Sequence, residues 1–186
     1  MNHGIERLVA YHCAPTLMGV KAGNLFSLKR NAYAAQADKM KDTLHTLGKK
    51  GLSAHIFHSP GDTTLVYLYR RELLEQNLSH PLSKKLLAKE GYAGEDAEEL
   101  LCQLRLRLEK SEAFPHEIGL FLGYPPEDVM GFVRHKGFNC KFSGCWKVYG
   151  DVGRAKTLFG QYAFCRNQCL GCVNQGMTLD QMVAAS

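Results

Sequence analysis

A histidine and a cysteine stand side by side near the start of the chain, at His12 and Cys13. A cysteine acts as a nucleophile when a nearby cation or a helix N-terminus stabilises its thiolate. His12 and Lys21 could supply the positive charge, and a more distant side chain could take the proton. We therefore treat Cys13 as a candidate catalytic nucleophile, with an inert cysteine buried in the core as the alternative.

The candidate acid–base partners of Cys13 are His116 and Glu117. They precede a short apolar run, Ile118–Leu122, which predicts a strand buried on both faces. Adjacent side chains on an extended chain point to opposite faces, so at most one of the pair can face a given cleft. The alternative is that both residues form hydrogen bonds within a loop.

Three cysteines near the C-terminus have the spacing of an iron–sulfur motif. They are Cys165, Cys169 and Cys172, spaced as in the three-cysteine loop of radical-SAM enzymes. A fourth thiolate from Cys140 or Cys145 would complete a set that holds zinc or a cluster. However, residues 154–174 predict one helix, on which the three cysteines form a stripe that also suits packing against a sheet. Metal or iron–sulfur binding is therefore an alternative, and the sequence identifies no other cofactor.

Two aromatic residues complete the candidate ligand site. Tyr124 follows the apolar run Ile118–Leu122, and Trp146, the only tryptophan, lies in another apolar stretch. An aromatic side chain at a pocket wall and one in the core produce the same sequence pattern. With His12 and Lys21, these two residues form the candidate ligand-binding set.

The strands that must position these residues are few. Leu52–His58 and Thr63–Arg70 flank a turn cluster, which predicts an antiparallel hairpin. Ile118–Leu122 and Asn139–Tyr149 predict two further strands, the second interrupted at Gly144. We expect an α/β or α+β fold in which a small mixed sheet carries helices packed on its faces.

Helices are expected where good helix formers or apolar residues recur at helical spacing. The first is expected to end at Cys13–Pro15, because proline disfavours a helical conformation in the residue before it. A compact buried loop that contains a turn of strand or helix is expected over Thr16–Phe26. Another helix begins at Pro125 and Pro126, since proline suits a first helical turn. The remaining predicted helices cover Asn31–Leu47, Arg71–Leu78, Leu82–Lys89, Glu95–Lys110 and a segment from Val152 onward.

Length and composition limit the classes of function. The 186 residues fit a single globular domain, residues 1–186, with a core that needs no disulfides. The net charge of +5 is modest and the basic residues are dispersed, so nucleic acid is not expected as a partner. No apolar leader or membrane-spanning run is visible. We therefore expect a cytoplasmic protein whose 7 cysteines are reduced.

Three stretches together resemble one bacterial family. They are His12–Leu17 with Gly19 and Lys21, His116–Asp128 with Gly131 and Phe132, and Gly144–Tyr149. Over nearly the whole chain, the sequence is similar to the family catalogued as domain of unknown function 3793, found largely in anaerobic, clostridia-like bacteria. The resemblance carries no activity. It implies a cytosolic bacterial protein, and the company of its genes suggests a role near iron or flavodoxin-type redox physiology.

The chain has no Walker loop, no GxGxxG after a strand, no HExxH and no GxSxG. Nucleotide hydrolysis, dinucleotide redox chemistry, zinc proteolysis and serine hydrolysis are therefore not expected. We predict an accessory protein of redox or metal physiology that binds a small molecule or a redox protein partner. One alternative is a small enzyme that uses Cys13 with His116 or Glu117 as acid or base. The other is a metal or iron–sulfur protein that uses the C-terminal cysteines.

Overall fold

A three-stranded antiparallel sheet lies at the centre of the fold. The computed structural model describes residues 4–110 and 114–184. Its strands, β1 (Gly23–Lys29), β2 (Leu52–Ser59) and β3 (Thr63–Arg70), are ordered β1-β3-β2. The central strand β3 is rich in β-branched and aromatic residues, which fit a pleated, buried surface. Its side chains alternate between the two faces, so Val66 enters one buried cluster and Tyr67 enters another.

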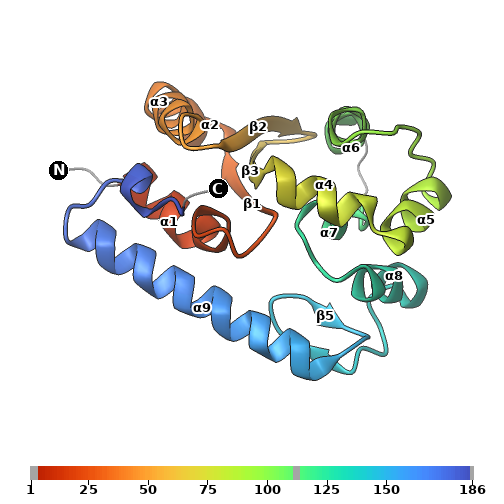
Figure 1. The fold of residues 1–186 in the computed structure, drawn as a ribbon. Helices are drawn as coiled ribbons and strands as arrows, with labels where there is room; N and C mark the ends of the chain where they lie inside the picture. The colour runs from red at the N-terminus through yellow and green to blue at the C-terminus, as the bar shows by residue number, and fades with distance from the viewer. Residues whose placement is uncertain (1–3, 111–113, 185–186) are drawn as a thin grey trace.

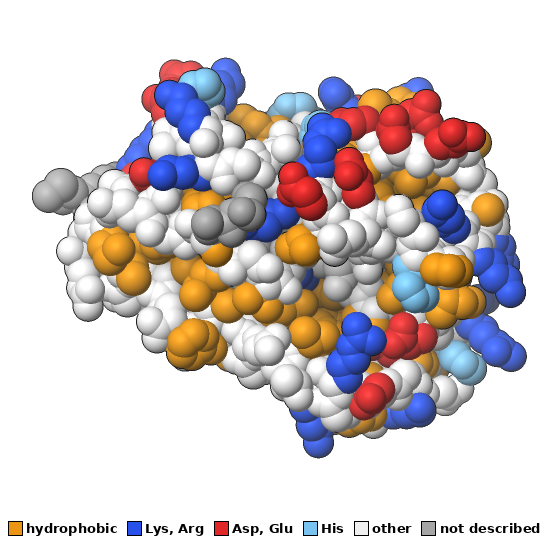
Figure 2. All heavy atoms as spheres, in the orientation of Figure 1, with side chains coloured by type: hydrophobic (Ala, Val, Ile, Leu, Met, Phe, Trp, Pro, Cys, Tyr) orange, Lys and Arg blue, Asp and Glu red, His pale blue; other side chains and the backbone are white. Residues whose placement is uncertain are grey.

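The first cluster lies between the sheet and two helices, α1 (Gly4–Leu17) and α9 (Val152–Asn174). Figure 1 shows α1 packed between α9 and the sheet, with α2 (Arg30–Ala34) and α3 (Ala37–Gly48) nearby. A 3-10 turn, η1 (Leu179–Met182), packs beside α1 and α9. Figure 2 shows hydrophobic side chains exposed in a band along α1 and α9. No helix in the described part of the chain is both long and apolar enough to cross a membrane.

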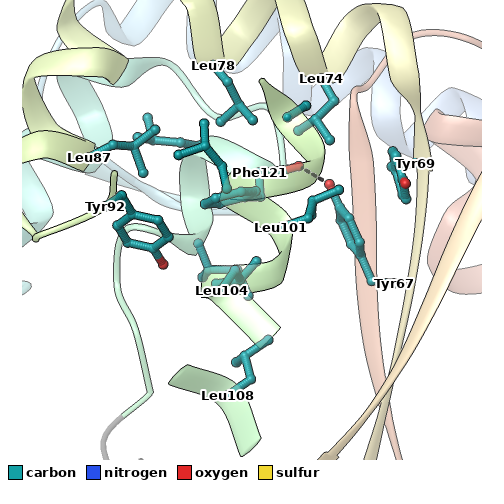
Figure 3. Packing of buried hydrophobic residues seen from close by; sticks show 14 of the residues in the cluster. Tyr67, Tyr69, Leu74, Leu78, Leu87, Tyr92, Leu101, Leu104, Leu108 and Phe121 are labelled. Atoms are coloured by element: carbon teal, nitrogen blue, oxygen red, sulfur yellow. Dashed lines mark hydrogen bonds between the residues drawn. The ribbon is translucent and has the colours of Figure 1, made fainter. Parts of the chain in front are cut away.

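The second cluster lies on the other face of the sheet. The helices on that side are α4 (Arg71–Ser79), α5 (Pro81–Lys89), α6 (Ala97–Lys110), α7 (Ile118–Phe121) and α8 (Pro126–His135). Figure 3 shows Tyr67 reaching into this cluster, where its hydroxyl donates a 2.6 Å hydrogen bond to the backbone carbonyl of Phe121. Gly23 makes room for the Tyr67 ring, because a Cβ there would stand 2.6 Å from it. The hydrogen bond fixes α7 against the sheet.

A small hairpin joins α8 to α9. It consists of β4 (Phe142–Ser143) and β5 (Lys147–Val148). Asp151 caps the following helix, because its side chain accepts a 3.0 Å hydrogen bond from the Arg154 N–H. The hairpin packs on α9 through a third buried cluster made of Trp146, Val148, Ala155 and Tyr162.

The predicted fold class is confirmed in its α+β form, with helices on both faces of a small sheet. The sheet is antiparallel throughout rather than mixed. The predicted hairpin is β2 and β3, and the predicted helices α4, α5, α6, α8 and α9 are all present. The third strand is β1, which begins inside the segment where a buried loop was expected, Thr16–Phe26.

The prediction of a strand over Ile118–Leu122 is wrong, because this run forms the helical turn α7. The Leu122 N–H donates a 3.0 Å hydrogen bond to the Ile118 carbonyl, as in a helix. All four residues of α7 are buried, which accounts for the apolar run. A short apolar run does not distinguish a buried strand from a buried turn of helix.

Two other predicted elements are divided. The predicted strand Asn139–Tyr149 is wrong as a single strand, because the chain reverses at Gly144 between β4 and β5. The Gly144 N–H donates a 3.0 Å hydrogen bond to the Trp146 carbonyl across that turn. The predicted helix Asn31–Leu47 is present as two helices, α2 and α3, because the backbone leaves helical geometry at Gln36.

The first helix does not end at Cys13–Pro15, as predicted, but continues to Leu17. Its last turn, including Pro15, is buried in the core. Arg70 donates 2.8 Å hydrogen bonds to the carbonyls of Thr16 and Leu17. These bonds satisfy carbonyls that a helix C-terminus otherwise leaves open, and they stabilise the extra turn beyond proline.

Candidate functional site

Cys13, the candidate nucleophile, lies inside α1 with 0% of its surface exposed. It packs among apolar side chains between α1, the sheet and α9. Burial raises the pKa of its thiol to about 12, although the positive charge of Lys21 acts in the opposite direction. At neutral pH the sulfur is therefore an enclosed, neutral thiol, as in a structural cysteine.

Glu117 lies in a buried polar network on the other face of the sheet. It accepts a 2.9 Å hydrogen bond from the Tyr92 hydroxyl and pairs with Arg107 across 3.6 Å. The Arg107 guanidinium also lies over the Tyr92 ring, 4.3 Å from its centroid. Burial and the Glu117 charge raise the pKa of Tyr92, so its hydroxyl remains a donor. The network ties α7 to α6, and within it Glu117 has a structural role.

His116 instead lines an apolar pocket of about 460 Å³. Its ring meets Phe132 of α8 edge-on, with the two centroids 5.0 Å apart. Only His116 of the predicted pair therefore faces a cleft. The structure does not bring Cys13, His116 and Glu117 together, because Cys13 is enclosed on the opposite face of the sheet.

The three C-terminal cysteines lie on α9. Cys165 and Cys169 are buried in the cluster that holds Cys13, whereas Cys172 is half-buried. Burial raises the pKa of Cys169 to about 11, so its thiol keeps its proton at neutral pH. Among residues 4–110 and 114–184, no group of three or more His, Cys, Asp or Glu side chains is placed to hold a metal ion.

His12, a predicted ligand-binding residue, packs within the aromatic side chains around α1. Its ring stacks on Phe26 of β1 with the centroids 5.2 Å apart, and Tyr11 meets it edge-on. Burial lowers the pKa of its imidazole, and the nearby charge of Arg166 lowers that pKa further. These ring contacts pack His12 between α1 and β1.

Lys21 lies in the turn between α1 and β1 and is only 6% exposed. Its ammonium nitrogen lies 4.8 Å from the centroid of the Tyr124 ring and 5.5 Å from that of Tyr162. Within the described residues, the ammonium group of Lys21 forms no hydrogen bond or ion pair. Burial lowers the pKa of Lys21 to about 8; the thiols of Cys13 and Cys145 oppose that shift.

Lys21 is one of the residues that line a pocket of about 330 Å³. Figure 1 shows that the end of α1, α4, the start of α8 and the first half of α9 surround one region of the molecule. Gly123 lets the α7–α8 turn approach the lysine turn, because a Cβ at this position would stand 2.9 Å from that of Ala22. The pocket is lined by Val20, Lys21, Ala22, Leu73, Gln76, Asn77, His80, Gly123, Pro125, Pro126, Glu127, Arg154, Leu158 and Tyr162.

The polar groups of the pocket are mainly donors. Arg154 stands in the first turn of α9 and pairs loosely with Glu127 of α8 across 3.8 Å. His80 caps α5, where its Nδ1 accepts a 3.2 Å hydrogen bond from the Leu82 N–H, so Nε2 remains to donate. Glu127 offsets one positive charge, but the pocket with Lys21 and Arg154 still favours an anion.

Tyr124 connects Lys21 to Trp146. Its ring lies under the Lys21 ammonium and also stacks on Trp146, with ring centroids 4.8 Å apart. The indole N–H of Trp146 donates a 2.7 Å hydrogen bond to the buried carboxylate of Asp128. The other Asp128 oxygen accepts hydrogen bonds from the backbone N–H groups of Tyr149 and Gly150, both at 2.7 Å. Asp128 therefore fixes the aromatic wall on which Lys21 rests.

The structure thus brings together three of the four predicted ligand-binding residues, Lys21, Tyr124 and Trp146. Two residues that reach the pocket from α9, Arg154 and Tyr162, were not predicted. Their signal was present, because positions 154, 158 and 162 repeat at intervals of four and share one helical face. The prediction for this helix instead concerned the three cysteines farther along it.

A comparison with family models gives one match, which covers most of the chain. The model of the family described as "Protein of unknown function (DUF3793)" matches residues 9–183. Neither the curated proteins nor the solved structures contain a match. Because the family match covers nearly the whole chain, including the segments that form the Lys21 pocket, the protein belongs to the DUF3793 family.

Proposed function

We propose that this protein binds a small anionic molecule, carrying a carboxylate or phosphate group, in the Lys21 pocket. The observation that carries the proposal is the state of Lys21, a buried ammonium with aromatic neighbours and no acidic partner among the described residues. Burying a charge without a partner raises the free energy of the folded state. An anionic ligand would supply the missing partner and recover part of that cost.

The size and lining of the pocket support a metabolite rather than a macromolecule. Its volume of about 330 Å³ lies near the lower end of the roughly 300–1,000 Å³ typical of small-molecule sites. Arg154 and His80 lie at other points of the same wall, so a ligand with more than one acceptor could be oriented.

This proposal retains the predicted binding function and locates it. The role in redox or metal physiology, and a redox protein as partner, stay predictions implied by the family resemblance. The buried thiol of Cys13 gives no support to the alternative enzyme, because it is neutral and separated from His116 and Glu117.

The test is a titration of the purified protein with inorganic phosphate, propionate and succinate. Trp146 is the only tryptophan and stacks on Tyr124, so its fluorescence reports changes around Lys21. We expect a saturable change in emission for at least one of these anions, accompanied by a rise in Tm.

The matched control is a second lysine that also rests on an aromatic ring. Lys156 lies on the surface of α9, with its ammonium 4.9 Å from the Phe142 centroid. Lys21→Met should abolish the response, whereas Lys156→Met should keep it. Equal responses in both variants, or no saturable response to any of the three anions in the wild type, would contradict the proposal.

A further inference from the structure

The apolar pocket that His116 lines, called the His116 pocket below, shares no lining residue with the Lys21 pocket. Its walls come from α7, α8 and the β4–β5 hairpin, which meet around α8 in Figure 1. Ile118, Leu122 and Val129 supply aliphatic surface. Its volume of about 460 Å³ lies within the roughly 300–1,000 Å³ typical of small-molecule sites. The pocket is therefore large enough for a small organic molecule.

Aromatic rings form the rest of the apolar lining. Trp146 stacks on Tyr124 with the centroids 4.8 Å apart, and His116 meets Phe132 edge-on at 5.0 Å. Phe114, 49% exposed, lies in the same lining. Aromatic rings prefer offset-stacked or edge-to-face contacts with other rings. Walls of this kind therefore favour a flat aromatic ring as the occupant.

Asp128 and Lys147 are charged residues of the lining, and both bond within the protein. The Asp128 carboxylate accepts hydrogen bonds from the Trp146 indole and from two backbone N–H groups, so both of its oxygens are used. The Lys147 ammonium donates a 2.6 Å hydrogen bond to the Gly137 carbonyl. Because these charges already have partners, the pocket favours an uncharged molecule over an ion.

Contacts outside the cavity set the positions of its walls. The hydrogen bonds of Asp128 fix the hairpin on α8. Gly119 lets α7 approach α8, because a Cβ there would stand 2.8 Å from the Val129 side chain. Gly144 lets the hairpin turn rest on α9, because a Cβ there would overlap the Phe159 ring. A pocket whose walls are fixed in this way needs little ordering when a ligand binds.

We infer that the His116 pocket binds an uncharged small molecule that carries a flat aromatic ring. This site goes beyond the proposed function, because it has its own lining and takes no anion. The two sites are neighbours, since Tyr124 lines the His116 pocket and its ring also lies under the Lys21 ammonium. A test must therefore separate occupancy of one pocket from occupancy of the other.

The experiment uses Cys145, an exposed thiol in the lining of the His116 pocket, as the reporter. Cys102 of α6 is also exposed but lies outside the lining of both pockets, so it is the internal control. Labelling by N-phenylmaleimide and by N-methylmaleimide is compared at neutral pH by peptide mass spectrometry. Binding of the phenyl ring should raise the ratio of Cys145 to Cys102 labelling at least about tenfold over the methyl reagent. The rate at Cys145 should also saturate with the concentration of the phenyl reagent.

A reversible ligand and two matched variants locate the bound ring. Naphthol, which is uncharged at neutral pH, should slow the labelling of Cys145 but not of Cys102, in the wild type and in Lys21→Met alike. Phe114→Ser removes a half-exposed wall ring and should lower the phenyl preference by about threefold. Phe164→Ser removes a ring that is 59% exposed on α9, outside the pocket lining, and should leave the preference unchanged.

Each outcome decides the inference. A phenyl preference at Cys145 that naphthol removes supports it. If the methyl and phenyl reagents give the same ratio, or naphthol does not protect Cys145, the aromatic site is wrong and anion binding at Lys21 stands. An equal preference for N-cyclohexylmaleimide would show that the occupant is not a flat ring. If Lys21→Met loses the protection, or Phe164→Ser acts like Phe114→Ser, the ring binds elsewhere and the inference is wrong. A phenyl preference without any anion binding would instead overturn the proposed function alone.

Discussion

Arg70 and Lys21 are both buried cations near the end of α1, but they differ in what surrounds their charges. The Arg70 guanidinium, 4% exposed as a residue, donates hydrogen bonds to the carbonyls of Thr16, Leu17 and Ala184. Lys21 has only the rings of Tyr124 and Tyr162 within the described residues. The hydrogen bonds of Arg70 hold the end of α1, whereas the open donors of Lys21 are the reason for which we propose a ligand there. Burial alone therefore does not separate structural charges from functional ones.

The largest expected effect comes from removing the satisfied cation. Arg70→Met removes the charged donor from the carbonyls of Thr16, Leu17 and Ala184, and each hydrogen bond to a charged group contributes about 1.5–3 kcal/mol. The carbonyls of Thr16 and Leu17 keep their backbone donors, Gly19 and Ala184. We expect the free energy of unfolding to fall by about 4 kcal/mol, measured by urea denaturation. A loss below about 1 kcal/mol would show that these hydrogen bonds do not stabilise α1.

A buried carboxylate provides the anionic counterpart of Arg70. Asp128→Ala leaves the Trp146 N–H and the backbone N–H groups of Tyr149 and Gly150 without their acceptor. We expect a loss of about 3 kcal/mol in unfolding free energy and a shift in Trp146 emission. The adjacent Glu127→Ala is the control, since its loose surface ion pair contributes at most about 1 kcal/mol. Equal losses of unfolding free energy in the two variants would show that Asp128 does not support the aromatic wall of Tyr124 and Trp146.

Removing the charge of Lys21 should raise the free energy of unfolding, the opposite of the effect at Arg70. The pKa of Lys21 is about 8 in the folded protein and about 10.4 in the unfolded chain. Below pH 8 both states are protonated, and the full cost of burying the charge, about 3 kcal/mol, opposes folding. Losing the two cation–π contacts offsets about 1 kcal/mol. We therefore expect Lys21→Met to be more stable than wild type by about 2 kcal/mol near pH 7.

The pH dependence sharpens this prediction. Between pH 8 and about 10.4 the unfolded chain binds a proton that the folded protein does not, so wild-type stability rises with pH relative to Lys21→Met. The advantage of the variant should disappear by about pH 10.5. Urea denaturation of both proteins at the two pH values measures it, and a variant that is less stable at pH 7 would contradict the unpaired state of Lys21.

The smallest effect concerns the reactivity of the thiols. Cys102 and Cys145 are exposed, whereas Cys13 and Cys169 are buried and their pKa values are raised to about 12 and about 11. Iodoacetamide at pH 8 should label the exposed pair rapidly and the buried pair only after unfolding in urea, as read by mass spectrometry. Rapid labelling of Cys13 in the folded protein would restore it as a candidate nucleophile.

The parts of the fold that could be predicted are those whose local signals agree with their surroundings. The β2–β3 hairpin has alternating β-branched and aromatic residues around a turn, and α9 has its cap at Asp151. Ile118–Leu122 could not be assigned from its apolar run, because burial gives the same composition to a strand and to a helical turn. The length of α1 depends on Arg70, which is distant in sequence, so the local effect of Pro15 was misleading.

The candidate site could be predicted only in part for the same reason. Lys21, Tyr124 and Trp146 stood out as residue types, but that no acid among residues 4–110 and 114–184 pairs with Lys21 depends on the folded structure. Arg154 and Tyr162 come from α9, more than a hundred residues from Lys21 along the chain. Asp128 stands in the first turn of α8, and its hydrogen bonds to the hairpin depend on tertiary contacts.

The position of α1 between the sheet and α9 has a consequence for synthesis of the chain. One face of α1 packs on the sheet and another on α9, and the two helices are separated by most of the sequence. Chains are made from the N-terminus, so the apolar face of α1 that α9 later covers is exposed while the intervening residues are translated. Until residues 152–174 have left the ribosome, a growing chain carries an uncovered hydrophobic surface of the kind that chaperones bind.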